Sequence, residues 1–309
     1  MLPLVDLHRH LEGSIRSSTV LDVAERTGHK SVRRTALVAD DNQTGLLPYL
    51  DKVDLAIGVL TGLDDWSRAA REAVDDAFDD GLELLELRFC PGIIAHETGL
   101  APEAVIDAVA DAVAEQAKKR QLTVGLIGIV VRHLGADSAA AQMASLLARK
   151  ERFCAVDLAG DEANFPATLF ADAFSQARQA GLHVTIHAGE AAGPESVWDA
   201  VRELKAERIG HGVRAAEDPR LMEWLAAHGV TLEVSLTSNT QTGAAPSYAE
   251  HQIHTLLAAG VPVALCTDNP RASNVRLSQE HRTALAEVGL TPQQLTTVAE
   301  QSVIAAFVE

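Results

Sequence analysis

Positive charge is scarce in this sequence. Its 309 residues include 26 lysine and arginine residues against 43 aspartate and glutamate residues, which gives a formal net charge of −17 at pH 7. Nucleic acids and anionic membrane surfaces attract basic protein surfaces. The charge balance therefore argues against both as partners, and we expect a small molecule as the ligand.

Cysteine is also rare, and long apolar runs are missing. Cys90, Cys154 and Cys266 fall in apolar strand-like segments with no C-x-x-C spacing, so we expect three reduced, buried thiols. The longest apolar run, TVGLIGIVV, is too short to span a bilayer, and no basic-then-apolar leader precedes Val5. These features predict a soluble, cytoplasmic protein.

Two further absences concern cofactors and domains. No strand–turn–helix junction carries G-x-G-x-x-G or a P-loop, which argues against a nucleotide cofactor. No linker rich in Pro, Gly or Ser divides the chain.

What the sequence does contain is a regular alternation of apolar β-like runs with amphipathic helical stretches. The strand candidates are residues 4–10, 82–90, 123–133, 153–160, 183–190, 208–212, 231–238 and 262–268.

This alternation predicts the fold class. Continuously apolar strands that alternate with helices indicate a parallel α/β sheet buried on both faces. Hydrophobic residues make up 47% of the chain, enough for a large core, and α/β barrels often reach this length as one domain. Eight βα units fit a (β/α)8 TIM-type barrel better than an open doubly wound sheet. We therefore expect a single barrel domain over residues 1–309.

One segment, residues 30–65, is longer than a simple βα connection. It follows the first strand and its helix, and it contains the amphipathic stretch TGLLPYLDKVDLAIGVL. An extra helix packed on the side of the barrel is one interpretation. Insertions after barrel strands usually serve the active site, so we expect a helical lid over the barrel mouth.

The stretch DLHRHLEG, at residues 6–13, places His8 and His10 one residue apart on the first predicted strand. Side chains at i and i+2 of a strand point to the same face. Both imidazoles should therefore project together from the C-terminal end of that strand. On this stretch alone, they either share a metal ion or form separate hydrogen bonds.

Polar residues also stand at the ends of five other predicted strands: Gly160, His187, Glu190, His211, Ser238, Asn239, Asp268 and Asn269. In a barrel, the C-terminal strand ends converge on the rim that carries active sites. Four histidines, a glutamate and an aspartate at one rim are hard to explain as buried polar residues with only a structural role. We therefore predict that His8 and His10 belong to a metal site.

His8, His10, His187 and Asp268 offer three imidazoles and one carboxylate. This donor set suits zinc, with a water to complete the coordination. Iron(II), manganese or cobalt could occupy the same kind of site. A two-metal hydrolase of this architecture would need a bridging ligand, commonly a modified lysine, from the fourth strand. Since FCAVDLAG has no lysine, we expect one metal ion per chain.

The sequence resembles adenosine deaminases of the amidohydrolase superfamily over essentially its whole length. Six motifs carry the resemblance in the family's order: DLHRHLEG, DLAGDE, HAGEAAGPESV, RIGHG, SLTSNTQTG and TDNP. The resemblance implies a zinc-dependent hydrolysis of adenosine and 2′-deoxyadenosine to inosine and 2′-deoxyinosine plus ammonia, a reaction of purine salvage. The chain is rather short, and it departs from the commonest pattern at Glu12 and Asn269, where the family usually has Asp. Asn at the second position also appears among bacterial members.

The implied reaction assigns roles to the rim residues. The metal would lower the pKa of its water from 15.7 toward roughly 7. Asp268 could both bind the metal and orient that water toward C6 of the purine. His211 would act beside it, as a base or as an electrostatic stabiliser. Glu190 would be the general acid toward N1, because protonation of N1 makes C6 electrophilic.

The same resemblance suggests substrate contacts. His10 would bind substrate as well as metal, and Glu12 would reach the ribose 5′-hydroxyl unless it is a salt-bridged surface residue. Gly160 could place its backbone N–H against N3, or only form a tight turn. Asn269 would face N7, where an amide can donate at any pH. Ser238 and Asn239 are expected to fix the loop, and no role is assigned to His29, His96, His228, His251, His254 and His281.

Other functions remain open at this point. The nearest alternative is deamination of another 6-aminopurine, such as free adenine or a 5′-modified nucleoside like aminodeoxyfutalosine. Another is a mononuclear metal-dependent amide or ester hydrolase on the same barrel. A barrel that binds metal and purine without turnover is disfavoured, because Glu190 and His211 are both present.

Overall fold

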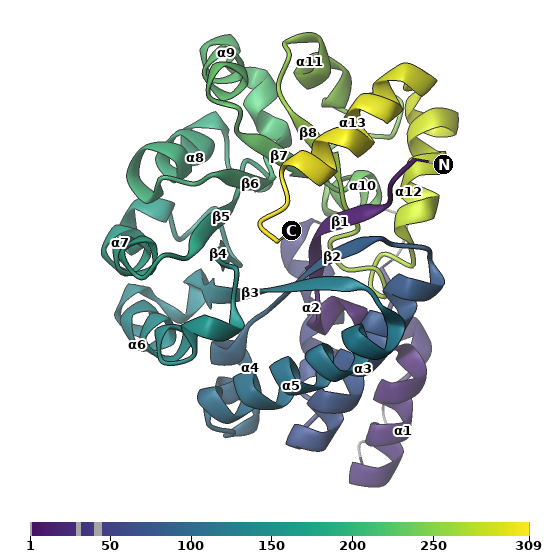
Figure 1. The fold of residues 1–309 in the computed structure, drawn as a ribbon, viewed down its shortest axis with the longest axis vertical. Coiled ribbons are helices and arrows are strands. Elements are labelled where there is room, and N and C mark those ends of the chain that lie inside the picture. Colours follow the sequence, from purple (N-terminus) through teal and green to yellow (C-terminus); the bar gives the residue numbers. More distant parts are fainter. Residues whose placement is uncertain (1, 29–31, 40–44, 309) are drawn as a thin grey trace.

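Eight parallel strands follow one another in chain order around a barrel (Figure 1). The computed structural model describes residues 2–28, 32–39 and 45–308. The strands close into a barrel because the Asp268 N–H donates to the carbonyl of His8 and the His10 N–H donates to that of Asp268. The predicted (β/α)8 fold is confirmed, and each strand lies within its predicted segment. The strands are β1 (Val5–His10), β2 (Leu84–Phe89), β3 (Thr123–Val131), β4 (Ala155–Ala159), β5 (His183–Ala188), β6 (Arg208–His211), β7 (Thr231–Val234) and β8 (Val263–Leu265).

Helices surround the strands (Figure 1). Several begin at a proline, whose fixed φ suits the first helical position. In α5 the apolar side chains of Val105, Ile106, Val109 and Val113 are buried. The helices are α1 (Ser17–Thr27), α2 (Leu46–Ile57), α3 (Leu63–Asp79), α4 (Pro91–Thr98), α5 (Pro102–Arg120), α6 (Ala136–Leu147), α7 (Ala171–Gln179), α8 (Pro194–Asp199), α9 (Pro219–His228), α10 (Leu236–Thr242), α11 (Ile253–Ala258), α12 (Leu277–Thr283) and α13 (Pro292–Ile304).

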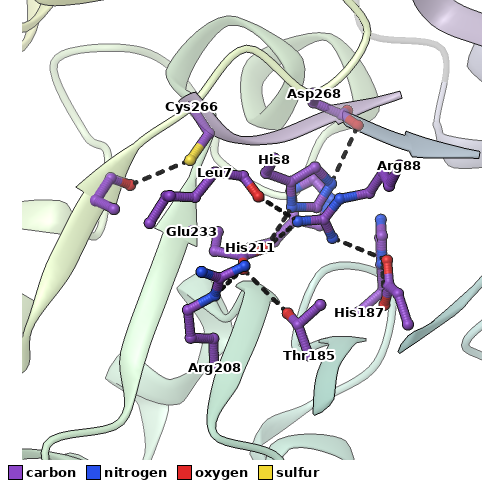
Figure 2. A network of polar contacts seen from close by, with 12 residues as sticks. Leu7, His8, Arg88, Thr185, His187, Arg208, His211, Glu233, Cys266 and Asp268 are labelled. Carbon is purple, nitrogen blue, oxygen red and sulfur yellow. Dashed lines mark hydrogen bonds and ion pairs between the residues drawn. The ribbon is translucent and has the colours of Figure 1, made fainter. Parts of the chain in front are cut away.

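Charged residues fill part of the barrel interior. Arg88 on β2 forms ion pairs of 2.8 Å with Asp157 on β4 and with Glu233 on β7. Arg208 on β6 pairs with Glu233 (Figure 2) and with Glu86. All five side chains are at most 2% exposed. Because an unpaired buried charge is strongly destabilising, these charges need one another. The network lies next to the histidines of the rim.

The segment between β1 and β2 carries α1, α2 and α3. The predicted insertion, residues 30–65, includes residues 30, 31 and 40–44, which lie outside the described residues. Its described part contains a 3-10 turn (Arg34–Ala36), α2 and the start of α3. Tyr49 of α2 is buried, and its hydroxyl lies 2.7 Å from Ser273 Oγ in the loop after β8. This contact joins α2 to the rim of the barrel.

Cys90, Cys154 and Cys266 are free thiols, as expected, but the expectation that all three are buried is wrong. Cys266 is buried, whereas Cys90 and Cys154 are partly exposed. Cys90 directly follows β2, and its side chain reaches a pocket at the rim. No helix in the described part of the chain has both the length and the apolar character that a membrane crossing would need.

Candidate active site

The four predicted metal ligands come together at the C-terminal rim. One ligand atom from each of His8, His10, His187 and Asp268 lies within 4.8 Å of the others. His10 Nε2 lies 3.2 Å from the Nε2 atoms of His8 and His187 and 3.3 Å from Asp268 Oδ1. Three imidazole nitrogens and one carboxylate oxygen that converge on one point are the donor set of a zinc-type site. The residues present fit a divalent metal ion.

Two carboxylates below the rim orient these imidazoles. His8 Nδ1 lies 2.8 Å from Glu233 Oε2 (Figure 2), and His187 Nδ1 lies 3.1 Å from Asp157 Oδ1. A proton held on Nδ1 leaves the Nε2 lone pair free for a metal. Burial opposes the charge of Glu233, but Arg88 and Arg208 outweigh it and hold its pKa well below the usual value. The supporting carboxylate therefore stays ionised.

The protonation of the histidines fits ligation in part. Burial lowers the pKa of His10 and His187, so both rings are neutral near pH 7. Burial and Arg88 also lower the pKa of His8, but hydrogen bonds to Asp268 and Glu233 outweigh them and raise it. Metal ligands have to be neutral imidazoles. A metal would thus compete with a proton at His8 more than at the other two.

A pocket lies directly above the cluster, between the rim and α2. Its volume is about 80 Å³. The pocket is lined by residues from the rim and by one face of α2: His10, Glu12, Leu46, Tyr49, Leu50, Val53, Asp54, Ile57, Cys90, Ile93, Val131, His133, Ala159, Gly160, His187, Glu190, His211, Asp268 and Asn269. Every residue predicted from sequence to act on metal or substrate, except fully buried His8, lines it.

Glu190 and His211 face each other in this pocket. Burial, together with the carboxylates of Asp268 and Glu162, raises the pKa of Glu190 to about 8. The carboxyl is therefore protonated near neutral pH, as a general acid requires. His211 Nε2 lies 3.6 Å from Glu190 Oε2. His211 and Asp268 also have φ angles of 62° and 60°, which non-glycine residues rarely adopt and which often mark functional sites.

Glu162 holds the loop that carries Glu190, and sequence reasoning missed it. Its buried carboxylate accepts the backbone N–H groups of Gly189, Glu190, Ala191 and Ala192, at distances of 2.5–3.1 Å. The signal was present in DLAGDE, where Glu162 follows Gly160 by two residues at a strand end. Only the folded chain shows that this carboxylate turns toward the neighbouring loop after β5.

Ser238 and Asn239 lie on α10, not at the end of β7 as expected. Ser238 Oγ donates to Asp268 Oδ2 at 2.5 Å. Asn239 Nδ2 lies 3.0 Å from His211 Nδ1, and His251 Nε2 lies 3.4 Å from Asn239 Oδ1. Both α10 residues thus support rim residues. His251, which had no assigned role, belongs to the same chain of contacts, whereas His29 lies outside the described residues.

Gly160 and Asn269 each meet a neighbour closely. Gly160 has a φ of 105°, and a Cβ there would come within 2.5 Å of His133 Nδ1, so the tight turn is present. Asn269 Nδ2 donates to Asp268 Oδ1 at 2.7 Å. A Cβ on Gly13 would lie 1.9 Å from Asn269 Oδ1, which explains why glycine stands there. Asn269 has one further amide N–H for a ligand.

Comparisons with known proteins agree with this geometry. The family model described as adenosine deaminase matches residues 3–309. An adenosine deaminase of Klebsiella pneumoniae is 43% identical over 99% of this chain and 94% of its own. Among solved structures, adenine deaminase from Arthrobacter aurescens is similar, with a TM-score of 0.92, 25% identity and coverage of 100% and 95%. A zinc-bound amidohydrolase from Burkholderia ambifaria gives the same TM-score and identity, with coverage of 100% and 86%.

Proposed function

Because this chain belongs to the adenosine deaminase family, a family of hydrolases, we propose that it deaminates adenosine and 2′-deoxyadenosine by hydrolysis. The observation that carries the proposal is a pocket that lies directly above the His8–His10–His187–Asp268 cluster and is also lined by Glu190, whose pKa is raised to about 8. A metal cluster alone would serve many hydrolases. A protonated carboxyl beside it suits a reaction that must protonate a ring nitrogen.

The four clustered residues would hold one zinc ion per chain. Bound there, zinc would act as a Lewis acid and would lower the pKa of a coordinated water toward roughly 7. Asp268 is well placed to aim a water, because Ser238 and Asn269 each donate to its carboxylate and fix its orientation. The donor set and the zinc in the Burkholderia ambifaria relative support this metal.

The chain's own residues would manage the protons and the purine. Glu190 delivers a proton to N1. Glu162 keeps the loop that carries Glu190 in place, because its carboxylate accepts four backbone N–H groups of that loop. Gly160 presents its backbone N–H to N3, and the free amide N–H of Asn269 faces N7. His10 contacts the substrate as well as the metal. The residues His10, Gly160, Glu190 and Asn269 all line one pocket.

We also propose that α2, the described core of the 30–65 insertion, is a lid. Leu46, Leu50, Val53 and Ile57 cover the pocket with one apolar face. A helix in this position would have to shift outward for substrate to enter and product to leave.

A substrate panel tests the proposed reaction. Zinc-loaded protein should lower the ultraviolet absorbance at the adenosine maximum and release ammonia. Adenosine, 2′-deoxyadenosine, adenine and 5′-substituted adenosines should be compared at equal concentration. Faster turnover of adenine would favour the activity that the Arthrobacter aurescens neighbour is named for, and turnover of none of them would contradict the proposal.

Glu12 should set the preference at the ribose end of the pocket. It is 2% exposed and forms no ion pair in the described chain, so the surface alternative is wrong. Its Oε1 accepts the Cys90 N–H at 2.7 Å, whereas Oε2 is buried without a partner in the described part of the protein. Burial chiefly raises its pKa to about 7. A substrate hydroxyl would supply the missing partner.

We predict that 5′-deoxyadenosine is a poorer substrate than adenosine. When Glu12 is ionised, above its pKa of about 7, loss of a hydrogen bond to this charged group corresponds to about a 10- to 150-fold loss in kcat/KM. Glu12→Ala should remove most of this difference. Asp54→Asn, which alters the other carboxylate at this end, is the matched control and should keep the ratio of the two substrates. An unchanged ratio in Glu12→Ala, or a wild-type preference for a 5′-extended nucleoside, would contradict the assignment.

A further inference from the structure

Behind His211 lies a chain of buried contacts that ends at a backbone N–H. The Ile253 N–H donates to His251 Nδ1 at 3.1 Å. His251 Nε2 lies 3.4 Å from Asn239 Oδ1, and Asn239 Nδ2 lies 3.0 Å from His211 Nδ1. The three side chains are 0–2% exposed, so protein groups and not solvent determine their hydrogen bonds. Their donor and acceptor roles can therefore be derived in sequence.

The backbone N–H fixes the direction of the whole chain, because it can only donate. His251 Nδ1 must accept, so the neutral ring carries its proton on Nε2 and donates it to Asn239 Oδ1. This turns the amide nitrogen of Asn239 toward His211 Nδ1, which must accept in turn. Burial lowers the pKa of His251 to about 4, so its ring is neutral. A His211 ring whose Nδ1 accepts from the amide carries its one ring proton on Nε2.

We propose that His251 and Asn239 are positioning residues that lock His211 in the tautomer protonated at Nε2. His211 then presents a hydrogen-bond donor, and no lone pair, to the pocket. This inference rests on the proposed function and refines it: of the two roles considered for His211, base and electrostatic stabiliser, a ring that already carries its Nε2 proton fits the second. It can stabilise developing negative charge near C6 but cannot take a proton there.

Nitrogen NMR of the histidine rings tests the tautomer directly, without substrate. In the wild-type protein, His211 and His251 should both show protonated Nε2 and unprotonated Nδ1 near pH 7, with resonances assigned from His211→Gln and His251→Gln spectra. Asn239→Asp replaces the donor by a group that only accepts, so the His211 proton should move to Nδ1. A wild-type His211 protonated at Nδ1, or a tautomer unchanged in Asn239→Asp, would overturn the proposal.

Kinetics supply a second readout. Asn239→Asp should lower kcat on the order of 10²-fold, as loss of one preorganised donor does, with little change in KM. His251→Gln keeps a side-chain donor toward Asn239 Oδ1 and should retain the wild-type tautomer, whereas His251→Leu should not. If the protein proved inactive toward adenosine, the proposed function would fail while the tautomer measurement would still stand.

A different observation concerns a second cavity, of about 520 Å³, between the first turn of α1, the loop after β8 and the start of α12. It shares no lining residue with the active-site pocket. We call it the arginine cavity because five arginines line it, with Asp76 as the one carboxylate among the lining residues: Arg9, Arg16, Arg34, Arg271 and Arg276. Such a cavity is unexpected in a chain with a net charge of −17.

Only two of these arginines have a carboxylate partner in the described part of the chain. Arg9 pairs with Asp6 at 3.0 Å and Arg16 with Asp76 at 2.6 Å. Arg271 instead donates to backbone carbonyls, among them those of Lys52 at 2.9 Å and Glu12 at 3.3 Å, which leave its charge uncompensated. Arg34 and Arg276 are exposed and form no ion pair with described residues.

The floor of the arginine cavity offers further donors. Arg9 is 2% exposed, and only its Nε is engaged, by Asp6 and Thr267, so its two Nη groups lack partners within the described residues. The first turn of α1 contains Ser17 and Ser18, with no acidic residue and no side-chain cap. Unpaired N–H groups at a helix start favour anions.

The geometry points to a site for a small phosphate-bearing anion, either inorganic phosphate or the phosphates of a free nucleotide. Arginine donors match the oxygens of phosphate in pairs. Calorimetry should compare inorganic phosphate, pyrophosphate and uridine triphosphate at an ionic strength held constant with chloride. Uridine triphosphate has no 6-aminopurine, so it is no substrate. Tighter binding of the nucleotide than of pyrophosphate would identify nucleotides as the source, and equal binding would identify free phosphates.

Variants locate the binding. Arg34→Ala/Arg276→Ala should weaken the affinity at least about tenfold, since two charge-assisted hydrogen bonds are lost. Arg220→Ala is the matched control, because the Arg220 side chain is 90% exposed on α9, and it should bind as the wild type does. Two outcomes would overturn the site directly: no saturable binding of any of the three anions, or unchanged binding in the double variant. A third would be binding that is lost in His187→Ala but not in the double variant, because His187 lines the active-site pocket and the anion would then bind there.

Discussion

Replacing Glu190 by glutamine should lower kcat for adenosine by at least about 10²–10⁴-fold, the usual contribution of general acid catalysis. Glutamine has nearly the same shape and can donate a hydrogen bond, but it cannot transfer a proton to N1. The loop should stay in place, because Glu162 holds it through backbone N–H groups that the substitution leaves unchanged. Metal content should match the wild type, which separates this loss from loss of the metal site.

The matched control is Glu195→Gln, an exposed carboxyl five residues further along the chain, in the first turn of α8. It should keep wild-type activity. Steady-state rates, metal analysis and circular dichroism of both variants complete the measurement. A Glu190→Gln protein that retained a tenth of wild-type turnover would mean that another group supplies the proton.

The raised pKa of Glu190 also predicts a pH dependence. Burial and the carboxylates of Asp268 and Glu162 raise this pKa to about 8. The general acid is protonated, and thus active, below that pH, and it loses its proton as the pH rises through about 8. The rate should therefore fall on the alkaline side. Glu190→Gln should lack this alkaline limb, because its amide does not titrate.

The sequence was sufficient to predict the barrel and the residues of its rim. Each strand lies in a short segment rich in apolar residues, so its approximate position follows from the local sequence. Side chains at i and i+2 of a strand, such as His8 and His10, must share a face. The convergence of His187, His211 and Asp268 then follows from the barrel, whose C-terminal strand ends meet at one rim. These inferences need strand order but no detailed register.

The supporting residues could not be placed in the same way. Glu233 meets His8, and Asp157 meets His187, only because the stagger of the strands brings them level across the barrel. Stagger depends on packing between strands far apart in sequence. A signal did exist, since Arg88, Asp157 and Glu233 are charged residues in otherwise apolar strands. A buried charge requires a partner, but the sequence does not say which one.

Glu12 and His251 illustrate a second limit. Both lie outside the strands, where the spacing of hydrophobic residues does not predict which side chains are buried. Both side chains prove to be at most 2% exposed. Glu12 is covered because a 3-10 turn (Glu12–Ser14) folds back over the end of β1 and under α2. His251 lies in the turn that precedes α11, and its Nδ1 accepts the Ile253 N–H. Tertiary contacts, not local sequence, decide whether such residues are part of the site.

Removal of a ligand of the metal cluster should have the largest effect of all. His8→Ala, His187→Ala and Asp268→Ala should each lose metal and activity together, because three donors left in a rim built for four hold a divalent ion poorly. Elemental analysis of the purified wild type should give about one zinc per chain, and each variant should give far less. The loss of activity should reach the background rate.

Two matched variants make this result specific to the cluster. His183→Ala removes an exposed histidine from the same strand as His187, four residues earlier, and should keep both metal and activity. Asp157→Asn removes the charge behind His187 but no ligand, so metal affinity should fall only about 10–100-fold, as it does when an outer-shell carboxylate is lost. Metal content should therefore be lowest in the three ligand variants, intermediate in Asp157→Asn and unchanged in His183→Ala. Full metal occupancy in all three ligand variants would show that the ion binds elsewhere.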